Sequence, residues 1–369
     1  MTTLKPPFRA DHVGSLLRPK AVQEAREQYK QGTITAARLR QFEDVAIREA
    51  VRLQEDVGLH GITDGEIRRG SWHMDFLYQF GGVEKVQTNL KVRFQNEQGA
   101  LEFTPSALEV NGRIKLEKPI FEDDFSFLKS ITTRTPKLTI PAPSMMHYRG
   151  GRAAIDESVY PTLDEFWHDL GNAYAQELEA LGKAGCTYLQ LDDTSLAYLN
   201  DPTQREYVNN LGGDGDTQHL TYIRLINASL AKKPADMTVC IHLCRGNFRS
   251  SWVASGGYEH VAEALFSELN VDGYFLEWDD ERSGGFEPLR FVPKNKKVVL
   301  GLVTSKKPQL EGKDELKRRI DEAAHYVPLE QLCLSPQCGF SSTVEGNEVT
   351  VEDQIAKLKL VAETAREVW

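Results

Sequence analysis

Short apolar runs alternate along this chain with longer amphipathic stretches. Such alternation is typical of βα units, in which each buried strand is followed by a helix that returns the chain to the same edge of a parallel sheet. The apolar runs predict strands over residues 11–15, 61–66, 138–144, 188–192, 238–244, 273–278, 297–303 and 332–338.

The amphipathic stretches show helical periodicity. In the clearest of them, apolar residues recur three or four positions apart on one face: Leu39, Phe42, Ala46, Ala50, Leu53 and Val57. Gly58 follows as the residue that terminates the helix. The same pattern predicts helices over 163–181, 258–269, 314–324 and 351–368.

Eight strands separated by helices predict an α/β chain folded as a (β/α)8 barrel, also called a TIM barrel. The chain has 369 residues, and barrels of this size form one domain. No internal repeat or linker divides it, so we expect residues 1–369 to form a single barrel domain. In such a barrel the chemistry lies where strands end and βα loops begin.

The segment 81–133 interrupts this pattern after the second expected strand. It contains alternating apolar residues on both sides of Asn111-Gly112. Asn-Gly is a strong hairpin signal, because both residues can adopt positive φ. We therefore expect an inserted β-hairpin element here, which could cover a site, join two chains or decorate the barrel.

Composition narrows the setting of the protein. Five cysteines, an odd number, do not form the disulfide framework of a secreted domain, and the first ten residues lack the apolar core of a secretion signal. We therefore expect a cytoplasmic protein. No apolar stretch is long enough for a bilayer, and a formal net charge of −10 argues against nucleic acid. We expect neither a membrane nor a nucleic-acid partner, and homo-oligomers stay open.

A histidine and a cysteine lie two residues apart at the end of one apolar run. Because alternate residues of a strand point to one side, His242 and Cys244 can bind the same ion. Cys338 and Glu277, each at the end of another strand, would add a thiolate and a carboxylate, and this mixture favours zinc. A His or Cys in an apolar strand is also a common core residue. Core packing is our interpretation of the other cysteines, Cys186, Cys240 and Cys333.

Further polar residues fall at predicted strand ends and would surround the same mouth of the barrel. These are Ser15, Glu66 and Asp192. Either carboxylate by itself could be a helix N-cap or a solvated loop charge. Their convergence with the metal candidates predicts a pocket.

These motifs, in this order, resemble the catalytic, C-terminal barrel of cobalamin-independent methionine synthase, as a single-barrel member of that family. The resemblance covers essentially the whole chain and rests on His12-Val13-Gly14-Ser15, Asp64-Gly65-Glu66, Leu189-Gln190-Leu191-Asp192, His242-Leu243-Cys244, Glu277 and Ser335-Pro336-Gln337-Cys338-Gly339-Phe340. It implies a methyltransferase of methionine biosynthesis, like 5-methyltetrahydropteroyltriglutamate–homocysteine S-methyltransferase.

The resemblance also implies roles for individual residues. Zinc would be the cofactor, and its ligands would be His242, Cys244, Glu277 and Cys338. Glu277 would be the ligand that leaves the zinc when the thiol of homocysteine binds. Glu66 and Asp192 would bind the ammonium group of homocysteine, and the turn Val13-Gly14-Ser15 would bind its carboxylate. Asp192 and Glu277 would also take part in catalysis.

The chain departs from the family in three places. It has no room for the N-terminal barrel that helps the family bind polyglutamylated folate, so either methyltetrahydrofolate or a methylcorrinoid is the expected methyl donor. Lys306 falls where the family has a proton-supplying histidine, and is a candidate for that role only if burial lowers its pKa. His147 or Tyr148 occupies the position where the family has a tryptophan that stacks on folate, and either ring could still stack but offers a smaller face.

Two other functions stay open. A related alkyltransferase would present another thiol, such as coenzyme M, to an epoxide or other electrophile. Three arginines near the mouth favour this alternative: Arg68, Arg69 and Arg245. The paired carboxylates Glu66 and Asp192 argue against it, because they would repel a sulfonate. A structural zinc site or a thiol-binding protein without turnover is the non-enzymatic alternative, although ligands from different barrel strands are unusual for a structural site.

Overall fold

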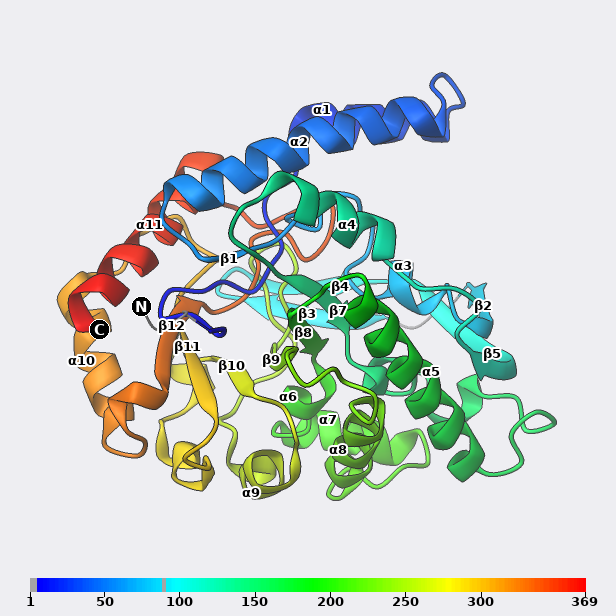
Figure 1. The fold of residues 1–369 in the computed structure, drawn as a ribbon. Coiled ribbons are helices and arrows are strands. Elements are labelled where there is room, and N and C mark those ends of the chain that lie inside the picture. The colour runs from blue at the N-terminus through cyan, green and yellow to red at the C-terminus, as the bar shows by residue number, and fades with distance from the viewer. Residues whose placement is uncertain (1–4, 88–90) are drawn as a thin grey trace.

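A parallel sheet forms the centre of the molecule in the computed structural model, which describes residues 5–87 and 91–369. Six strands lie side by side in chain order (Figure 1). They are β7 (Leu138–Pro141), β8 (Tyr188–Asp193), β9 (Thr238–Leu243), β10 (Gly273–Glu277), β11 (Lys297–Val303) and β12 (Leu332–Pro336). The strands are buried almost throughout, as a parallel sheet between a packed interior and outer helices requires.

Two less regular segments join the ends of this sheet. β1 (Gly61–Ile62) pairs in parallel with β6 (Thr135–Pro136), which leads into β7 after one residue. On the other side, Ala10 forms a parallel bridge to Leu334 of β12, and the Leu16 N–H donates to the Gly65 carbonyl at 3.0 Å. Hydrogen bonds therefore run around the whole circuit.

The α/β class and the parallel sheet predicted from the sequence are confirmed. The expected strands at 11–15 and 61–66 are less regular than predicted, because side chains satisfy several of the backbone groups that a neighbouring strand would otherwise bind. Thr63 Oγ1 donates to the Gly14 carbonyl at 2.7 Å, and Gln190 Nε2 donates to the Val13 carbonyl at 2.6 Å.

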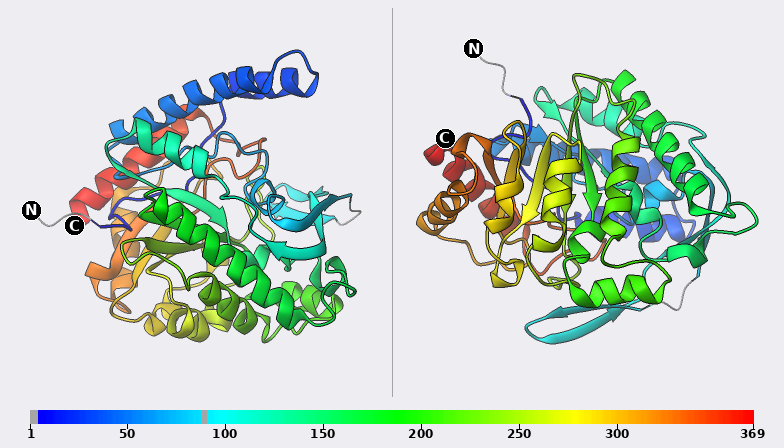
Figure 2. Two further views of the ribbon diagram at one scale, coloured as in Figure 1. Left: turned by 45° about the vertical axis from the view of Figure 1, so that its right-hand side comes forward. Right: turned by 90° about the horizontal axis from the view of Figure 1, so that it is seen from below.

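Helices surround the sheet (Figures 1 and 2). The longer ones are α1 (Lys20–Lys30), α2 (Ala36–Asp56), α4 (Glu122–Ile131), α5 (Leu163–Lys183), α7 (Pro202–Asn210), α8 (Gln218–Ser229), α9 (Glu259–Glu268), α10 (Lys313–Ala324) and α11 (Val351–Val368). Single turns form α3 (Met74–Leu77) and α6 (Ser195–Tyr198). All five helices predicted from periodicity are confirmed, and Gly58 follows the end of α2 with φ +97°. Within the described residues, no helix is long and apolar enough to cross a membrane.

Antiparallel strands occupy the segment between β1 and β6. β2 (Gly81–Val86) pairs with β5 (Ala107–Lys115), and β3 (Val92–Asn96) forms a hairpin with β4 (Gly99–Phe103). The hairpin turn predicted at Asn111-Gly112 is wrong, since both residues lie inside β5. That the segment 81–133 is an insertion within a single domain stays a prediction.

The Asn-Gly pair instead occupies an irregularity in the β2–β5 pairing. The register shifts between Gly81 and Val83, and a Cβ added to Gly82 would lie 2.5 Å from the Gly112 carbonyl oxygen. Residue 82 must be glycine because the backbones of β2 and β5 approach closely at this point. A glycine inside a strand often marks such a close approach rather than a turn. The turn of the hairpin lies at residues 97–98.

The interior of the barrel contains a small cluster of buried apolar residues: Phe8, Val13, Tyr188, Cys240, Phe275, Val299 and Cys333. Cys186 lies in the larger core between sheet and helices. The packing role predicted for these three cysteines is confirmed.

Candidate metal centre and substrate pocket

Strand β9 and the loop after β12 bring three metal-ligating side chains together. His242, Cys244 and Cys338 are buried, and their ligand atoms all lie within 4.8 Å of one another. The two sulfur atoms are 3.4 Å apart. Both ring nitrogens of His242 are buried without a hydrogen-bond partner among the described residues. An imidazole with free nitrogens beside two thiols is a donor set that suits zinc, so the residues present fit this ion.

The two thiols have different acidities. The contact with Cys244 is the largest cause that lowers the pKa of Cys338 well below its usual value, and the same contact raises the pKa of Cys244. Two adjacent buried sulfurs cannot both carry a negative charge unless a cation lies between them. A divalent metal ion provides that charge.

Glu277, the fourth predicted ligand, lies outside this cluster. Its Oε1 accepts from Arg282 Nη2 at 2.7 Å and from Lys306 Nζ at 3.1 Å, and its Oε2 accepts from the Arg245 N–H at 2.9 Å. Burial opposes ionisation, but Lys306, Arg282 and Arg245 outweigh it and hold the pKa of Glu277 far below its ordinary value. The structure thus unites three of the four predicted ligands, and zinc binding by Glu277 stays a prediction.

Lys306 is buried and does not line the cavity beside the cluster. Its Nζ lies 3.1 Å from Glu277 and 3.4 Å from Asp279. Burial would lower the pKa of Lys306, but the two carboxylates outweigh burial and raise it. The condition set for proton donation, a lowered pKa, is therefore not met, and this role of Lys306 stays a prediction without support from its contacts.

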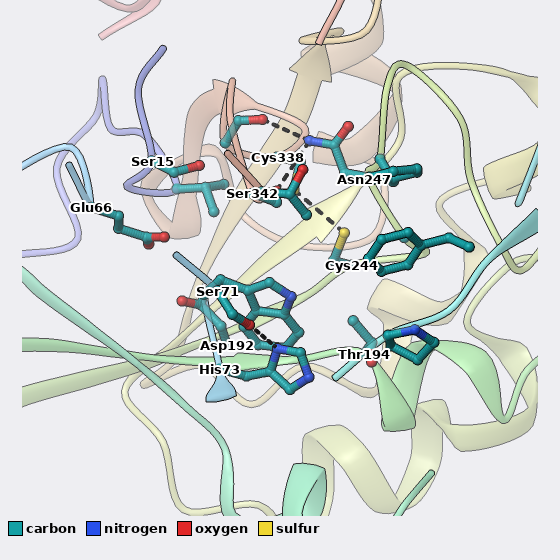
Figure 3. A pocket seen from close by; sticks show the side chains of 18 of the residues that line it. Ser15, Glu66, Ser71, His73, Asp192, Thr194, Cys244, Asn247, Cys338 and Ser342 are labelled. Carbon is teal, nitrogen blue, oxygen red and sulfur yellow. Dashed lines mark hydrogen bonds between the residues drawn. The ribbon is translucent and has the colours of Figure 1, made fainter. Parts of the chain in front are cut away.

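A cavity of about 260 Å³ opens beside the metal ligands, and all four residues predicted to bind substrate line it. They are Val13, Ser15, Glu66 and Asp192. Figure 3 labels Ser15, Glu66 and Asp192 among the residues around the cavity. The loop after β12 reaches Ser15 because residue 339 is glycine: a Cβ there would lie 1.9 Å from Ser15 Oγ. This close approach brings Cys338 next to the turn at residues 13–15.

Glu66 is held in an unusual backbone conformation, with φ +55° in the left-handed region. Its N–H donates to Asp64 Oδ1 at 2.8 Å, and its carbonyl accepts from Arg18 Nη2 at 3.1 Å. The side chain receives one hydrogen bond, from Thr139 Oγ1 at 2.7 Å, while Oε2 is buried without a partner in the described chain. Strain of this kind in a non-glycine residue is frequent at functional sites.

Asp192 is the second buried carboxylate of the cavity. Its Oδ1 accepts from Gln190 Nε2 at 2.7 Å. Burial, followed by the charge of Glu66, raises the pKa of Asp192 to about 7. Two neighbouring carboxylates with spare acceptor positions are stabilised by a cation placed between them, and an ammonium group supplies both the charge and the donors.

An aromatic wall, which sequence reasoning missed, closes one side of the cavity. Phe94 and Phe103 of the β3–β4 hairpin lie with ring centroids 5.2 and 4.6 Å from that of Phe248, and all three line the cavity with Trp72. Backbone hydrogen bonds between Gln95 and Trp252, at 2.8 and 3.0 Å, attach the hairpin to the loop after β9. Nothing in the alternation of β3 and β4 indicates what they pack against.

Further polar lining residues were also missed, among them His73, Arg149 and Asn247. Burial lowers the pKa of His73 well below its usual value, and its Nε2 has no partner in the described part of the chain. Asn247 Nδ2 donates to the Gly339 carbonyl at 2.7 Å. Their positions in loops after strands were the available signal, since βα loops form the site of a barrel.

The residues expected to replace a stacking tryptophan do not line this cavity. His147 Nδ1 lies 2.9 Å from the Tyr222 hydroxyl, and the Tyr148 hydroxyl donates to Gln204 Oε1 at 3.0 Å. Arg149 is the residue of this segment that faces the cavity. The three arginines predicted near the mouth do not line it either, since they pair with protein groups: Arg68 with Asp44, Arg69 with Glu66 and Arg245 with the Glu277 carbonyl.

Comparison with known proteins agrees with this geometry. Over residues 8–367 the chain matches the family described as the cobalamin-independent synthase catalytic domain. It is 47% identical over 367 residues to the uncharacterized protein YxjH of Bacillus subtilis, covering 99% of this chain and 96% of that protein. It is 24% identical over 306 residues to a methionine synthase of Pyrococcus furiosus, covering 80% of this chain and 76% of that protein.

A solved structure has the same fold. It is of a candidate vitamin-B12-independent methionine synthase from Listeria monocytogenes, is 40% identical, covers 98% of both chains and superposes with a TM-score of 0.79. With the sequence motifs, the shared fold and the His-Cys-Cys cluster in agreement, the chain belongs to the family of cobalamin-independent methionine synthase catalytic domains.

Proposed function

We propose that this chain is a zinc-dependent methyltransferase that transfers a methyl group to the thiol of homocysteine and so forms methionine. One observation carries the proposal: a buried His-Cys-Cys cluster and two buried carboxylates line the same cavity. The cluster suits a metal that binds a thiolate, and the carboxylates suit an ammonium group. Homocysteine carries both groups on one short chain.

His242, Cys244 and Cys338 would hold the zinc ion. A free thiol of pKa about 8.5 is only a few per cent thiolate at neutral pH. When bound, zinc would supply the positive charge that keeps the substrate sulfur deprotonated. The gain in thiolate is roughly 30-fold, so most of the acceleration must come from alignment of the two substrates.

The remaining residues would position the amino acid. Glu66 and Asp192 would accept hydrogen bonds from the ammonium group, and the turn at Val13-Gly14-Ser15 would bind the carboxylate through backbone and hydroxyl donors. The aromatic wall of Phe94, Phe103 and Phe248 would exclude water from the reacting sulfur. A cytoplasmic location stays a prediction.

The methyl donor is proposed to be 5-methyltetrahydrofolate or a methylcorrinoid. Relatives named methionine synthase, such as the Pyrococcus furiosus protein, support a methyl transfer of this kind. The donor must bring its methyl group to the sulfur through the cavity, whose aromatic faces can pack against a flat ring system.

A thiol such as coenzyme M, alkylated by an epoxide or another electrophile, is the second candidate. Arg149 favours it, because this cation lines the cavity and can pair with a sulfonate. Against it, the buried carboxylates Glu66 and Asp192 line the same cavity and would repel a substrate without an ammonium group.

The test is methionine formation by the zinc-loaded protein with homocysteine and each donor in turn: mono- and polyglutamyl methyltetrahydrofolate and methylcobalamin. We expect turnover with one donor, loss of turnover after chelation and recovery on adding zinc. Coenzyme M with an epoxide serves as the competing pair. Turnover of that pair, with none of homocysteine, would replace the proposed reaction.

A further inference from the structure

A second cavity adjoins the one that contains the metal ligands, and one arginine faces both. The first cavity has a volume of about 260 Å³ and the second about 280 Å³. Pro105, Ser106 and Arg149 line both of them. The consecutive residues His73 and Met74 line the first and the second cavity, respectively. Only a few side chains therefore separate the two cavities, and Arg149 lies at their junction.

The second cavity is mainly apolar. Its lining includes three methionines and two leucines: Met74, Met145, Met146, Leu108 and Leu211. Among the described residues, its charged lining residues are Arg149 and the exposed Glu109, and no metal ligand faces it. Methionine side chains are flexible and polarizable, so they adapt to apolar groups of irregular shape. This cavity suits the apolar part of a molecule larger than homocysteine.

The guanidinium group of Arg149 is available to a ligand. Within the described chain it forms no hydrogen bond or ion pair, whereas the nearby Arg152 donates to the carbonyls of Ile155 and Tyr160, at 3.0 and 2.7 Å. The backbone of Arg149 is fixed, because its carbonyl accepts from the Tyr207 hydroxyl at 2.6 Å. Arg149 is also the only lysine or arginine of the described residues that lines either cavity.

His73 provides a second free donor beside the junction. The Met74 N–H donates to Ser71 Oγ at 3.3 Å, and this oxygen lies 3.1 Å from His73 Nδ1 (Figure 3). The hydroxyl proton is then available to Nδ1, so the neutral ring carries its own proton on Nε2. Burial, followed by the charge of Arg149, lowers the pKa of His73 and keeps the ring neutral. Nε2 is buried without an acceptor in the described part of the chain.

The charges around the two cavities indicate what these donors bind. A guanidinium group without a partner, next to a free N–H, requires an acceptor, and carboxylates and phosphates match its two parallel donors. Glu66 and Asp192 line the first cavity and would repel an anion elsewhere in it. An anionic group that enters is therefore drawn to Arg149.

Homocysteine does not need this site. In the proposed function its ammonium group lies at Glu66 and Asp192, and its carboxylate lies at the turn of residues 13–15. The methyl donor is the remaining substrate, and both proposed donors contain an anionic group. Methyltetrahydrofolate has glutamyl carboxylates, and methylcobalamin has a phosphate. Coenzyme M has only a two-carbon chain, so it would leave the second cavity unused.

We propose that Arg149, assisted by the Nε2–H of His73, binds a carboxylate or phosphate of the methyl donor, and that the second cavity holds an apolar part of that donor. The two substrates then approach the predicted zinc site from different sides, the amino acid along residues 13–15 and the donor past Arg149. The inference rests on the proposed function, since it takes the ligand to be the methyl donor.

The test compares each donor with a neutral analogue, by titration calorimetry of the zinc-loaded protein without homocysteine. The pairs are 5-methyltetrahydrofolate with its diamide, and methylcobalamin with methylcobinamide, which lacks the phosphate. We expect Arg149→Met to weaken binding of one anionic donor at least tenfold, the effect of losing a hydrogen bond to a charged group, and to leave its neutral analogue unchanged. The affected pair identifies the source of the anion. Arg149→Lys should recover part of the loss, because it restores the charge without the fork.

A matched control removes an arginine that lines neither cavity. Arg93→Met, on the exposed side of β3, should keep the affinity for both members of each pair. His73→Phe keeps an aromatic ring beside Trp72 and should weaken the anionic donor about threefold to tenfold. Thermal melting of all variants checks that the fold is kept.

The second cavity is tested by filling it. Ala153 lines this cavity from an exposed position, so Ala153→Trp adds a ring there at little cost to folding. We expect it to weaken the anionic donor and its neutral analogue alike, by tenfold or more, and to keep the affinity for homocysteine. Unchanged donor binding would overturn the role of the second cavity.

The binding data separate this inference from the proposed function. Equal losses for the anionic and neutral members of a pair, or a loss confined to coenzyme M, would overturn the inference. So would unchanged donor binding by Arg149→Met, even if the unchanged protein forms methionine. Charge-dependent donor binding without methionine formation would instead support the anion site and contradict the proposed function.

Discussion

At the scale of single residues, the site is recognisable because its polar atoms lack partners within the described chain. Four such atoms are buried without a hydrogen-bond partner among the described residues: Glu66 Oε2, His73 Nε2 and both ring nitrogens of His242. Buried polar groups are almost always hydrogen-bonded, so several orphans around one cavity indicate a ligand. Glu66 is in addition held at positive φ, and backbone strain of this kind is frequent at functional sites.

Asp192 is expected to discriminate thiols by their ammonium group. Asp192→Asn should weaken homocysteine binding by about 1.5–3 kcal/mol, the range for a hydrogen bond to a charged group, but leave 4-mercaptobutanoate, which lacks the ammonium, nearly unchanged. Titration calorimetry of the zinc-loaded protein measures both. Asp321→Asn, on the exposed surface of α10, is the control. Equal losses for the two thiols would remove Asp192 from the ammonium site.

Cys338 and Cys333 offer a comparison between a ligand and a core residue. Cys338→Ser should abolish stoichiometric zinc content with little change in melting temperature, since a barrel of this size folds around its own apolar core. Cys333→Ser alters the interior cluster and should keep the zinc. Elemental analysis and thermal melting are the measurements. Full zinc occupancy in the Cys338 variant would contradict the assigned ligand set.

At the scale of elements, the site is assembled from strand ends and closed by the β3–β4 hairpin. Strand alternation brings His242 of β9 and Cys244 just after it to one side of the sheet. The hairpin contributes Phe94 and Phe103 from a segment far away in sequence. The barrel thus supplies the chemistry, and the hairpin supplies the cover.

The hairpin gives a prediction about the second substrate. Phe103→Ala should raise the KM for the methyl donor by about tenfold, since an aromatic contact contributes roughly 1.5 kcal/mol, and should leave zinc content unchanged. Glu102→Ala is the control, because Glu102 instead pairs with the exposed Lys91 at 2.8 Å. If both variants keep the KM of the unchanged enzyme, the hairpin is decoration rather than cover.

A buried carboxyl joins α5 to the start of α4 and makes stability depend on pH. Both oxygens of Glu177 accept the Ile120 N–H, at 3.0 and 2.9 Å, and burial raises the pKa of Glu177 from 4.5 to about 8. Between these two values the folded protein keeps a proton that the unfolded chain has lost. Stability should therefore fall as pH rises from about 5 to 8.

Glu177→Gln should weaken this dependence, because glutamine mimics the protonated carboxyl and cannot ionise. The difference in melting temperature between the variant and the unchanged protein should grow in favour of the variant towards about pH 8. Glu179→Gln, on the partly exposed face of α5, should give a curve parallel to the unchanged protein, since the hydrogen bond from Lys183 lowers the pKa of Glu179 and keeps this carboxylate ionised throughout the range. Parallel curves for both variants would contradict a retained proton on Glu177.

At the scale of the whole molecule, most of the barrel could be predicted from the sequence because each βα unit is encoded locally. Apolar runs and helical periodicity located the six regular strands and five of the longer helices, α2, α5, α9, α10 and α11. Polar residues at strand ends predicted which groups meet, since parallel strands end at one mouth. His242, Cys244, Cys338, Glu66 and Asp192 were all found in this way.

The failures of prediction share one physical cause, namely contacts between segments distant in sequence. The Asn111-Gly112 signal for a turn is local, but this pair lies within β5, where the Gly112 carbonyl comes so close to Gly82 that residue 82 must be glycine. Likewise, only the fold reveals that Lys306 and Arg282 pair with Glu277, whose binding to zinc stays a prediction.

The central claim is that His242, Cys244 and Cys338 hold a zinc ion that binds the thiol of homocysteine. X-ray absorption at the zinc edge tests it most directly, with the loaded protein measured before and after homocysteine is added. The account predicts two sulfur neighbours from the two cysteines before addition and a third afterwards. An unchanged number of sulfur neighbours in the presence of saturating homocysteine would contradict it.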